Sequence, residues 1–177
     1  MVRVISVVLF FIITTSCTIQ SYQLDYLKKI ILESESQQKP EKNWVLRLPW
    51  LDQVIELYAV NHEDQVIFLD ENIRIFFKNN HIYNVIGLIQ YEEEINIHKQ
   101  DSNYLYNLNQ IQIAQHSCED SQIIKLDDGK QKIIQNCVMN DDQGGYVNQI
   151  VFNQNNLIEH IKFKIHPNYP MIELSHK

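Results

Sequence analysis

The sequence predicts a mainly β protein of antiparallel strands, preceded by an export signal and one amphipathic helix. Three observations support this class. Isoleucine supplies 26 of the 177 residues, and β-branched side chains pack well on a pleated sheet. From Trp44 onward, short apolar segments alternate with turns that contain Asn, Asp or Gly. No strand–helix–strand period and no internal repeat is visible, so we expect a curved antiparallel sheet or a sandwich of roughly ten strands.

The first 16 residues have the anatomy of a secretory signal. Arg3 supplies a positive charge, Val4–Ile13 is apolar except for one serine, and the small residues Thr14–Ser16 precede Cys17. Lipoprotein signals carry a cysteine at this place, where its thiol receives a diacylglycerol. We therefore expect cleavage before Cys17 and lipidation of Cys17. One departure from the usual pattern is Thr14, which stands three residues before the cysteine, where lipoprotein signals usually have leucine.

Two alternatives stay open for this segment. It could be an ordinary secretory signal, or an uncleaved anchor, but Val4–Ile13 is far shorter than the ~20 residues that a spanning helix needs. Acyl chains on Cys17, at ~0.8 kcal/mol per buried methylene, would hold the protein on a membrane. The next residue is Thr18 and not Asp, which favours the outer membrane under the sorting rule of enteric bacteria. We expect a lipid-anchored envelope protein that faces the periplasm.

The chain divides into three predicted parts. Residues 1–16 are the signal, residues 17–43 a lipid-anchored tether, helix and linker, and residues 44–177 the antiparallel β domain. Tyr22–Glu33 has apolar residues at helical spacing; we expect it to pack on the domain's own sheet, with a partner helix or a membrane surface as alternatives. Ser34–Asn43 is polar and contains Pro40, as linkers do.

Composition limits the classes of partner. Removal of the signal leaves 161 of the 177 residues, enough for one domain with a substantial core. The formal net charge is −7, and without clusters of Lys and Arg this argues against a nucleic-acid partner.

Cys118 and Cys137 remain as a pair once Cys17 carries lipid. Disulfides form in oxidising compartments such as the periplasm. If a type I turn pairs Leu126 with Gly129, counting back along both strands places Cys118 opposite Cys137, where a disulfide can form. If the turn is of type I′ instead, Cys118 faces Met139.

The best-defined predicted element is a hairpin around Asn79-Asn80. Asparagine tolerates positive φ, so this pair can form a tight turn between Ile73–Lys78 and His81–Ile89. Pairing Lys78 with His81 would place Ile73 opposite Ile86 and Phe77 opposite Ile82, with one largely apolar face. Earlier strands are expected over Gln53–Val60 and Gln65–Leu69.

Further strands are expected toward the C-terminus. The Glu92–Glu94 charge run predicts a solvated bend, and a flexible loop is expected around Gly144. The last hairpin joins Tyr146–Phe152 to Leu157–Ile165, and prolines then break the chain before a final edge strand at Met171–Leu174. Two short segments are possible strands between these features: Tyr104–Leu108 and Ile111–Gln115.

No residue pattern indicates catalysis or a cofactor. His160 and His166 would lie ~20 Å apart along a strand, too far to share a metal ion. We expect all seven histidines to lie on the surface and no metal site. His116 and Cys118 could form a Cys–His pair, but neighbours two apart on a strand usually share only a face, and a disulfide would remove the thiol. We therefore expect no enzymatic activity and no cofactor.

Two segments carry a family resemblance. Trp44–Leu88 presents a strand, a hairpin and a strand ending in Gly87-Leu88. Tyr146–Phe152, the Asn153–Asn156 turn, and the stretch from Leu157 to Leu174 with its proline-containing break follow the same order as the C-terminal part of the group 4 capsule polysaccharide lipoprotein family. The chain resembles that family, although Phe152 and Asn153 replace its usual Trp and Asp.

This resemblance implies an outer-membrane lipoprotein linked to capsule or exopolysaccharide production, without catalytic residues to carry over. The expected role is a non-enzymatic accessory factor in secretion or assembly, with polysaccharide export proteins or the polysaccharide as partners. The alternative is a periplasmic lipid or lipoprotein carrier, or chaperone, with an apolar cavity.

Overall fold

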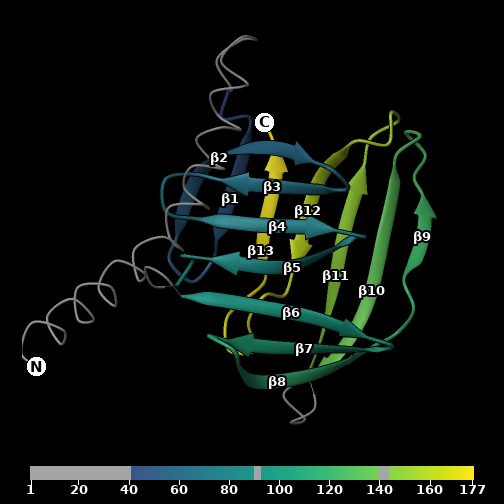
Figure 1. The fold of residues 1–177 in the computed structure, drawn as a ribbon. Helices are drawn as coiled ribbons and strands as arrows, with labels where there is room; N and C mark the ends of the chain where they lie inside the picture. The colour runs from purple at the N-terminus through teal and green to yellow at the C-terminus, as the bar shows by residue number, and fades with distance from the viewer. Residues whose placement is uncertain (1–40, 90–92, 140–143) are drawn as a thin grey trace, which may run out of the picture. The chain divides into compact units, whose positions relative to one another are not determined.

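A computed structural model of the chain describes residues 41–89, 93–139 and 144–177 (Figure 1). The signal, Cys17, the expected helix and the linker as far as Pro40 lie outside these residues, as does most of the expected loop before Gly144. The described part folds into thirteen antiparallel strands. They are β1 (Trp44–Leu48), β2 (Gln53–His62), β3 (Gln65–Leu69), β4 (Arg74–Lys78), β5 (His81–Ile86), β6 (Glu94–Gln100), β7 (Asn103–Leu108), β8 (Ile111–Cys118), β9 (Gln122–Lys125), β10 (Gln131–Met139), β11 (Gly145–Phe152), β12 (Ile158–Phe163) and β13 (Ile172–His176).

Twelve of these strands form a closed antiparallel barrel. Strands β1 to β8 follow one another as a meander, β10 pairs with both β8 and β11, and β13 lies between β12 and β1. The pair Leu46–Leu174 lies at the seam between β1 and β13, and both side chains are fully buried. The antiparallel β class is confirmed. The expected curved sheet or sandwich of roughly ten strands is a closed barrel among thirteen strands, and the expected edge strand at the C-terminus is wrong, because β13 is paired on both sides.

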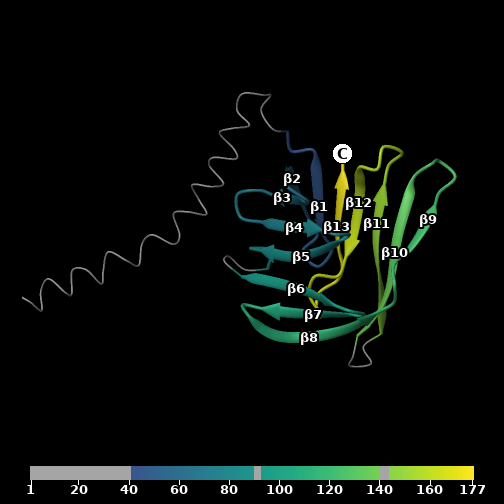
Figure 2. The ribbon, with the colours of Figure 1, turned by 45° about the vertical axis from the view of Figure 1, so that its right-hand side comes forward.

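The two sides of the barrel run in different directions. In Figure 1, β3–β7 run across the view, while β12 and β13 run up and down behind them and β10 and β11 run up and down at the right; Figure 2 shows the same crossing after rotation. This resembles the orthogonal packing of two sheets, in which strands turn the corner from one side to the other. β9 pairs with the first half of β10 and extends from the ring as an edge strand.

Alternating side chains fill the interior of the barrel. In β4, Ile75 and Phe77 are buried while Arg74, Phe76 and Lys78 are half-buried, as the alternation in the sequence predicts. The largest fully buried side chains come from many strands around the ring; they include Leu46, Phe68, Ile82, Ile97, Tyr106, Ile161 and Phe163.

The β4–β5 hairpin forms at the predicted turn. Asn79 and Asn80 have φ values of 50° and 61°, and Phe77 pairs with Ile82 as expected. The register then shifts by one residue, so that Arg74 pairs with Ile86, and the expected pairing of Ile73 with Ile86 is wrong. The cause is a bulge, in which an extra residue on one strand displaces all later pairs.

Gly87 follows this hairpin in a conformation that requires glycine. Its φ is +74°, and a Cβ atom there would lie 2.1 Å from the carbonyl oxygen of Asn72. The backbone of Gly87 also donates a hydrogen bond to the carbonyl of Glu93 (2.9 Å). The bend expected over Glu92–Glu94 does not extend to its last residue, since Glu94 already begins β6.

The cysteine hairpin combines two register changes. Gly129 donates to the carbonyl of Leu126 (3.0 Å) and Leu126 donates to that of Lys130 (2.9 Å), so a type I turn is followed by a glycine bulge with φ +80°. Leu126 pairs with Lys130, in neither of the two expected registers. An extra residue between β8 and β9 then restores the alignment, and Cys118 pairs directly with Cys137.

The last hairpin is confirmed. β11 and β12 are joined by a turn in which Asn153 Oδ1 accepts hydrogen bonds from the backbone of Asn155 (2.9 Å) and Leu157 (3.0 Å).

Among residues 41–89, 93–139 and 144–177, no helix is long and apolar enough to cross a membrane.

Candidate functional site

The interior of the barrel holds a cluster of polar side chains near the disulfide. Tyr106, His116, Asn148 and Lys164 are each less than 10 % exposed, and Tyr146 is half-buried beside them. They come from β7, β8, β11 and the connection between β12 and β13. We call these five residues the buried polar cluster.

Hydrogen bonds run through the cluster as a chain. The Tyr106 hydroxyl donates to the backbone carbonyl of Lys164 (3.3 Å) and lies 2.9 Å from the Tyr146 hydroxyl, which lies 2.8 Å from His116 Nδ1. Because a carbonyl oxygen only accepts, the consistent direction has Tyr146 donating to Tyr106 and His116 Nδ1–H donating to Tyr146.

Burial keeps the tyrosines of this region protonated. Burial raises the pKa of Tyr146 to about 12 and that of Tyr104, two residues before Tyr106 on β7, to about 12. Burial likewise raises the pKa of Tyr106 well above its usual value. At neutral pH these hydroxyls therefore act as neutral donors and acceptors.

Asn148 and Lys164 join this cluster to the disulfide and to the break before β13. Asn148 Oδ1 accepts a hydrogen bond from the Lys164 backbone (3.0 Å), and its Nδ2 lies 3.8 Å from Cys137 Sγ. Lys164 Nζ donates to the carbonyl of Tyr169 (2.6 Å) and lies 5.9 Å above the Tyr146 ring. Satisfied buried networks of this kind hold strands in one arrangement, so we assign the cluster a structural role.

The histidine prediction is partly wrong. His116 is 2 % and His166 is 7 % exposed, whereas both were expected on the surface. The signal for His116 was its position two residues before Cys118 on the same face of one strand, which is the interior face. Its neighbour Cys118 is joined to Cys137 in a disulfide, with Cα atoms 4.0 Å apart, so Cys118 has no free thiol for a Cys–His pair with His116. The expected juxtaposition of the two cysteines is confirmed.

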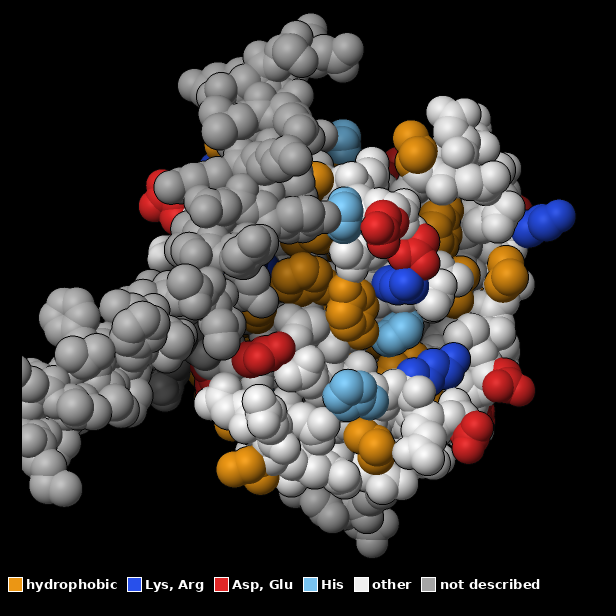
Figure 3. Space-filling model, viewed as in Figure 1, with side chains coloured by type: hydrophobic (Ala, Val, Ile, Leu, Met, Phe, Trp, Pro, Cys, Tyr) orange, Lys and Arg blue, Asp and Glu red, His pale blue; other side chains and the backbone are white. Residues whose placement is uncertain are grey.

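A pocket opens on the outside of the barrel, at the β2–β3 turn and the β4–β5 hairpin. Its volume is about 250 Å³ and its lining is polar and aromatic. Six residues line it: Glu63, Asp64, Gln65, Lys78, His81 and Tyr83. We call it the outer pocket. Figure 3 shows Asp or Glu, Lys and His side chains gathered beside hydrophobic ones over this part of the front sheet.

Strand register brings the floor of the outer pocket together. Gln65 pairs with Lys78, and Lys78 pairs with His81, so three side chains stand in one row across β3, β4 and β5. Tyr83 lies two residues from His81 and therefore on the same face. The sequence predicted the Lys78–His81 pair. It did not predict that Glu63 and Asp64 of the β2–β3 turn line the same pocket, because this depends on the pairing of β3 with β4.

Opposite charges in the outer pocket are paired. Lys78 Nζ lies 2.7 Å from Asp64 Oδ2, and the hydrogen bond from Lys78 lowers the pKa of Asp64. His81 Nδ1 lies 3.3 Å from the carbonyl of Asn79, and the dominant effect of burial lowers the pKa of His81. A neutral His81 that donates through Nδ1 presents Nε2 as an acceptor.

The Tyr83 ring is held in position by its neighbours. Its hydroxyl donates to Gln65 Oε1. Its ring lies 5.9 Å from the Phe76 ring, tilted by 52°, and 6.4 Å from the His81 ring. The outer pocket therefore combines the fixed Tyr83 ring with the Gln65 amide, the Lys78–Asp64 ion pair and the His81 imidazole.

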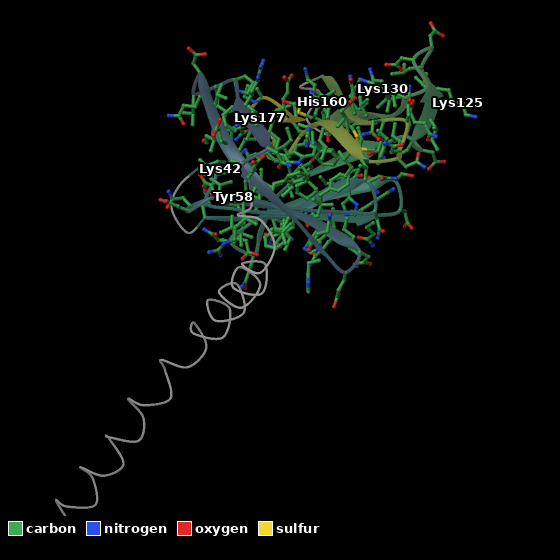
Figure 4. The ribbon with its side chains drawn as sticks, turned by 90° about the horizontal axis from the view of Figure 1, so that it is seen from above. Lys42, Tyr58, Lys125, Lys130, His160 and Lys177 are labelled. Carbon is green, nitrogen blue, oxygen red and sulfur yellow. A yellow bond between two sulfur atoms is a disulfide. The ribbon has the colours of Figure 1, made fainter. Side chains whose placement is uncertain are left out.

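Lysines at the rim seen from above have local partners. Figure 4 shows Lys42 and Tyr58 on one side, with Lys42 Nζ 5.3 Å from the Tyr58 ring. Lys177 is paired with Glu56, and Lys130 lies 2.7 Å from Glu159. Positive and negative side chains therefore lie together along this rim, and the lysines named here do not form a positively charged patch.

In the part of the chain that the structure describes, no three His, Cys, Asp or Glu side chains gather closely enough to hold a metal ion. No protein-family model matches the chain, and comparison with curated proteins and with solved structures finds no match.

Proposed function

We propose that this chain is a lipid-anchored, non-enzymatic accessory protein of the cell envelope that takes part in secretion or assembly of a capsule or exopolysaccharide. The observation that carries the proposal is the export-type N-terminus, in which an apolar segment and three small residues end at Cys17. The likeness of the two hairpin regions to capsule polysaccharide lipoproteins supplies the link to polysaccharide.

Features of the β domain support a role outside the cytoplasm. A disulfide between adjacent strands suits an oxidising compartment. The buried histidine and tyrosines are hydrogen-bonded to one another and to backbone, which supports a structural use of these groups rather than catalysis.

The alternative is a carrier that encloses a lipid or acyl chain. Bulky side chains such as Phe68, Tyr106 and Phe163 occupy the interior of the barrel, and an enclosed acyl chain would have to displace some of them. This favours the accessory role. Mass spectrometry of organic extracts from the purified protein tests the alternative, which requires a stoichiometric lipid besides the anchor.

The proposal is tested in a deletion strain. We expect deletion to reduce surface polysaccharide, and the wild-type gene to restore it. A Cys17→Ser gene, whose product lacks the lipidated thiol, should restore less at equal protein abundance. Normal surface polysaccharide in the deletion strain would contradict the proposal.

A further inference from the structure

The outer pocket has the size of a single sugar ring. Its volume of about 250 Å³ equals that of roughly eight water molecules at ~30 Å³ each. It is smaller than the ~300–1,000 Å³ typical of pockets for drug-sized ligands. A single polar ring or a short polar group therefore fits better than a lipid chain.

The polar groups of the outer pocket suit a ligand with several hydroxyl groups. The Asp64 carboxylate and His81 Nε2 accept hydrogen bonds, while the Lys78 ammonium donates them. Gln65 accepts from Tyr83 through Oε1, so its amide nitrogen can donate to a ligand. Adjacent hydroxyls are each both donor and acceptor, and alternating acceptors and donors at neighbouring positions match them.

Charge in the outer pocket favours a neutral ligand over an acid. Lys78 is compensated by Asp64 at 2.7 Å, and Glu63 adds a further negative charge to the lining. A carboxylate or phosphate entering here would meet a negative excess and would compete with Asp64 for Lys78. Like-charge contacts of this kind oppose binding.

Tyr83 supplies the apolar surface that a sugar ring needs. One face of a pyranose carries several C–H groups, which pack on an aromatic ring through dispersion. The contacts with Phe76 and His81 hold the Tyr83 ring in the wall of the pocket. Little side-chain freedom would then be lost on binding.

We propose that the outer pocket binds one neutral sugar residue of a saccharide chain. The source of that saccharide rests on the proposed function, whereas the site itself rests on the side chains of Gln65, Lys78, His81 and Tyr83. It would make the β domain a direct contact for polysaccharide rather than only a partner of export proteins.

The test uses the full mature protein in a detergent without a sugar headgroup. Isomaltotriose, mannotriose and galactotriose serve as neutral probes, and trigalacturonate as the acidic one. Backbone amide NMR signals of residues 63–65 and 78–83 are followed during titration. We expect saturable shifts with at least one neutral probe and at least tenfold weaker binding of trigalacturonate.

Variants connect the binding to the pocket. Tyr83→Ala should weaken binding at least tenfold, and Tyr83→Phe, which keeps the ring, by only a few-fold. Tyr58→Ala removes a tyrosine outside the pocket and should bind as the wild type does. Thermal unfolding checks that each variant folds, and Gln65→Ala replaces Tyr83→Ala if the latter does not.

Three results would overturn the inference: no saturable shift with any neutral probe, equal affinity of the pocket variants and Tyr58→Ala, or stronger binding of trigalacturonate. Its failure is distinguishable from failure of the proposed function. Absent sugar binding with a polysaccharide defect in the deletion strain removes only the pocket. Sugar binding with normal surface polysaccharide removes only the proposed function.

Discussion

Cys118 and Cys137 lie directly opposite each other on β8 and β10, with Cα atoms 4.0 Å apart, although the residues nearest their turn pair one position out of that register. The glycine bulge at the turn and the extra residue between β8 and β9 compensate each other. The disulfide thus closes a hairpin whose sequence separation is 19 residues.

Loss of this disulfide should destabilise the domain. A disulfide that closes a loop of this length lowers the conformational entropy of the unfolded chain, which stabilises the folded state by about 3 kcal/mol. We expect Cys118→Ala with Cys137→Ala to lower the free energy of unfolding by about that amount, as measured by urea titration. Reductant should shift the wild type toward the variant and leave the variant unchanged. Equal unfolding midpoints for the oxidised wild type and the variant would contradict this prediction.

Gly87→Ala should be strongly destabilising. The positive φ costs an L-residue about 1–2 kcal/mol, and the new Cβ would also lie 2.1 Å from the Asn72 carbonyl oxygen. Gly144→Ala is the matched control, because its φ is +99° but nothing lies within 4 Å of the added Cβ. Urea unfolding should show a clearly larger loss for Gly87→Ala. Equal losses would mean that the Asn72 contact has no effect.

Stability should fall in alkaline solution because of the buried tyrosines. Tyr104 and Tyr146 have pKa values raised to about 12 by burial, against a usual value of 10.0. Since the native pKa is raised, the stabilisation is complete below pH 10 and is lost as the pH rises from 10 to about 12. Each such tyrosine adds a slope of about 1.4 kcal/mol per pH unit in that window.

Tyr146→Phe tests this assignment. Removing one titrating group should make the alkaline loss of stability less steep, as measured by urea unfolding at successive pH values. The same change removes the hydroxyl that bonds to Tyr106 and His116, which should cost about 1–2 kcal/mol at neutral pH. An unchanged alkaline slope would show that Tyr146 titrates alike in the folded and unfolded states.

Closure of the barrel should depend on β13. A chain that ends at Pro170 lacks this strand and leaves the facing edges of β1 and β12 unpaired. It also removes Leu174, the buried partner of Leu46. We expect this chain to be unfolded by circular dichroism and sensitive to protease. A chain that ends at His176 lacks only Lys177 and should fold, since β13 is retained. A folded, protease-resistant chain ending at Pro170 would show that closure is dispensable.

The sequence by itself determined the local features of this protein. The antiparallel class, the Asn79-Asn80 turn and the last hairpin all follow from patterns within a few residues, and the export-type N-terminus stays a prediction from a pattern of the same kind. Turn residues and period-two alternation act through local backbone geometry, so a single sequence is enough to predict them. The Lys78–His81 pair is a local consequence of the same kind.

The tertiary structure alone decided closure, register and burial. Pairing of Leu46 with Leu174 joins the two ends of the domain, and no local pattern encodes such a contact. The bulge in β5 and the glycine bulge at Gly129 shifted the expected pairs by one residue, and the extra residue between β8 and β9 restored the Cys118–Cys137 pair. His116 became buried because its face of β8 is turned inward by the closed sheet. The outer pocket likewise needs β2 to β5 side by side, since its lining comes from the β2–β3 turn and from β3, β4 and β5. Local propensity specifies each hairpin, but the burial of apolar surface around the whole ring selects how the hairpins meet.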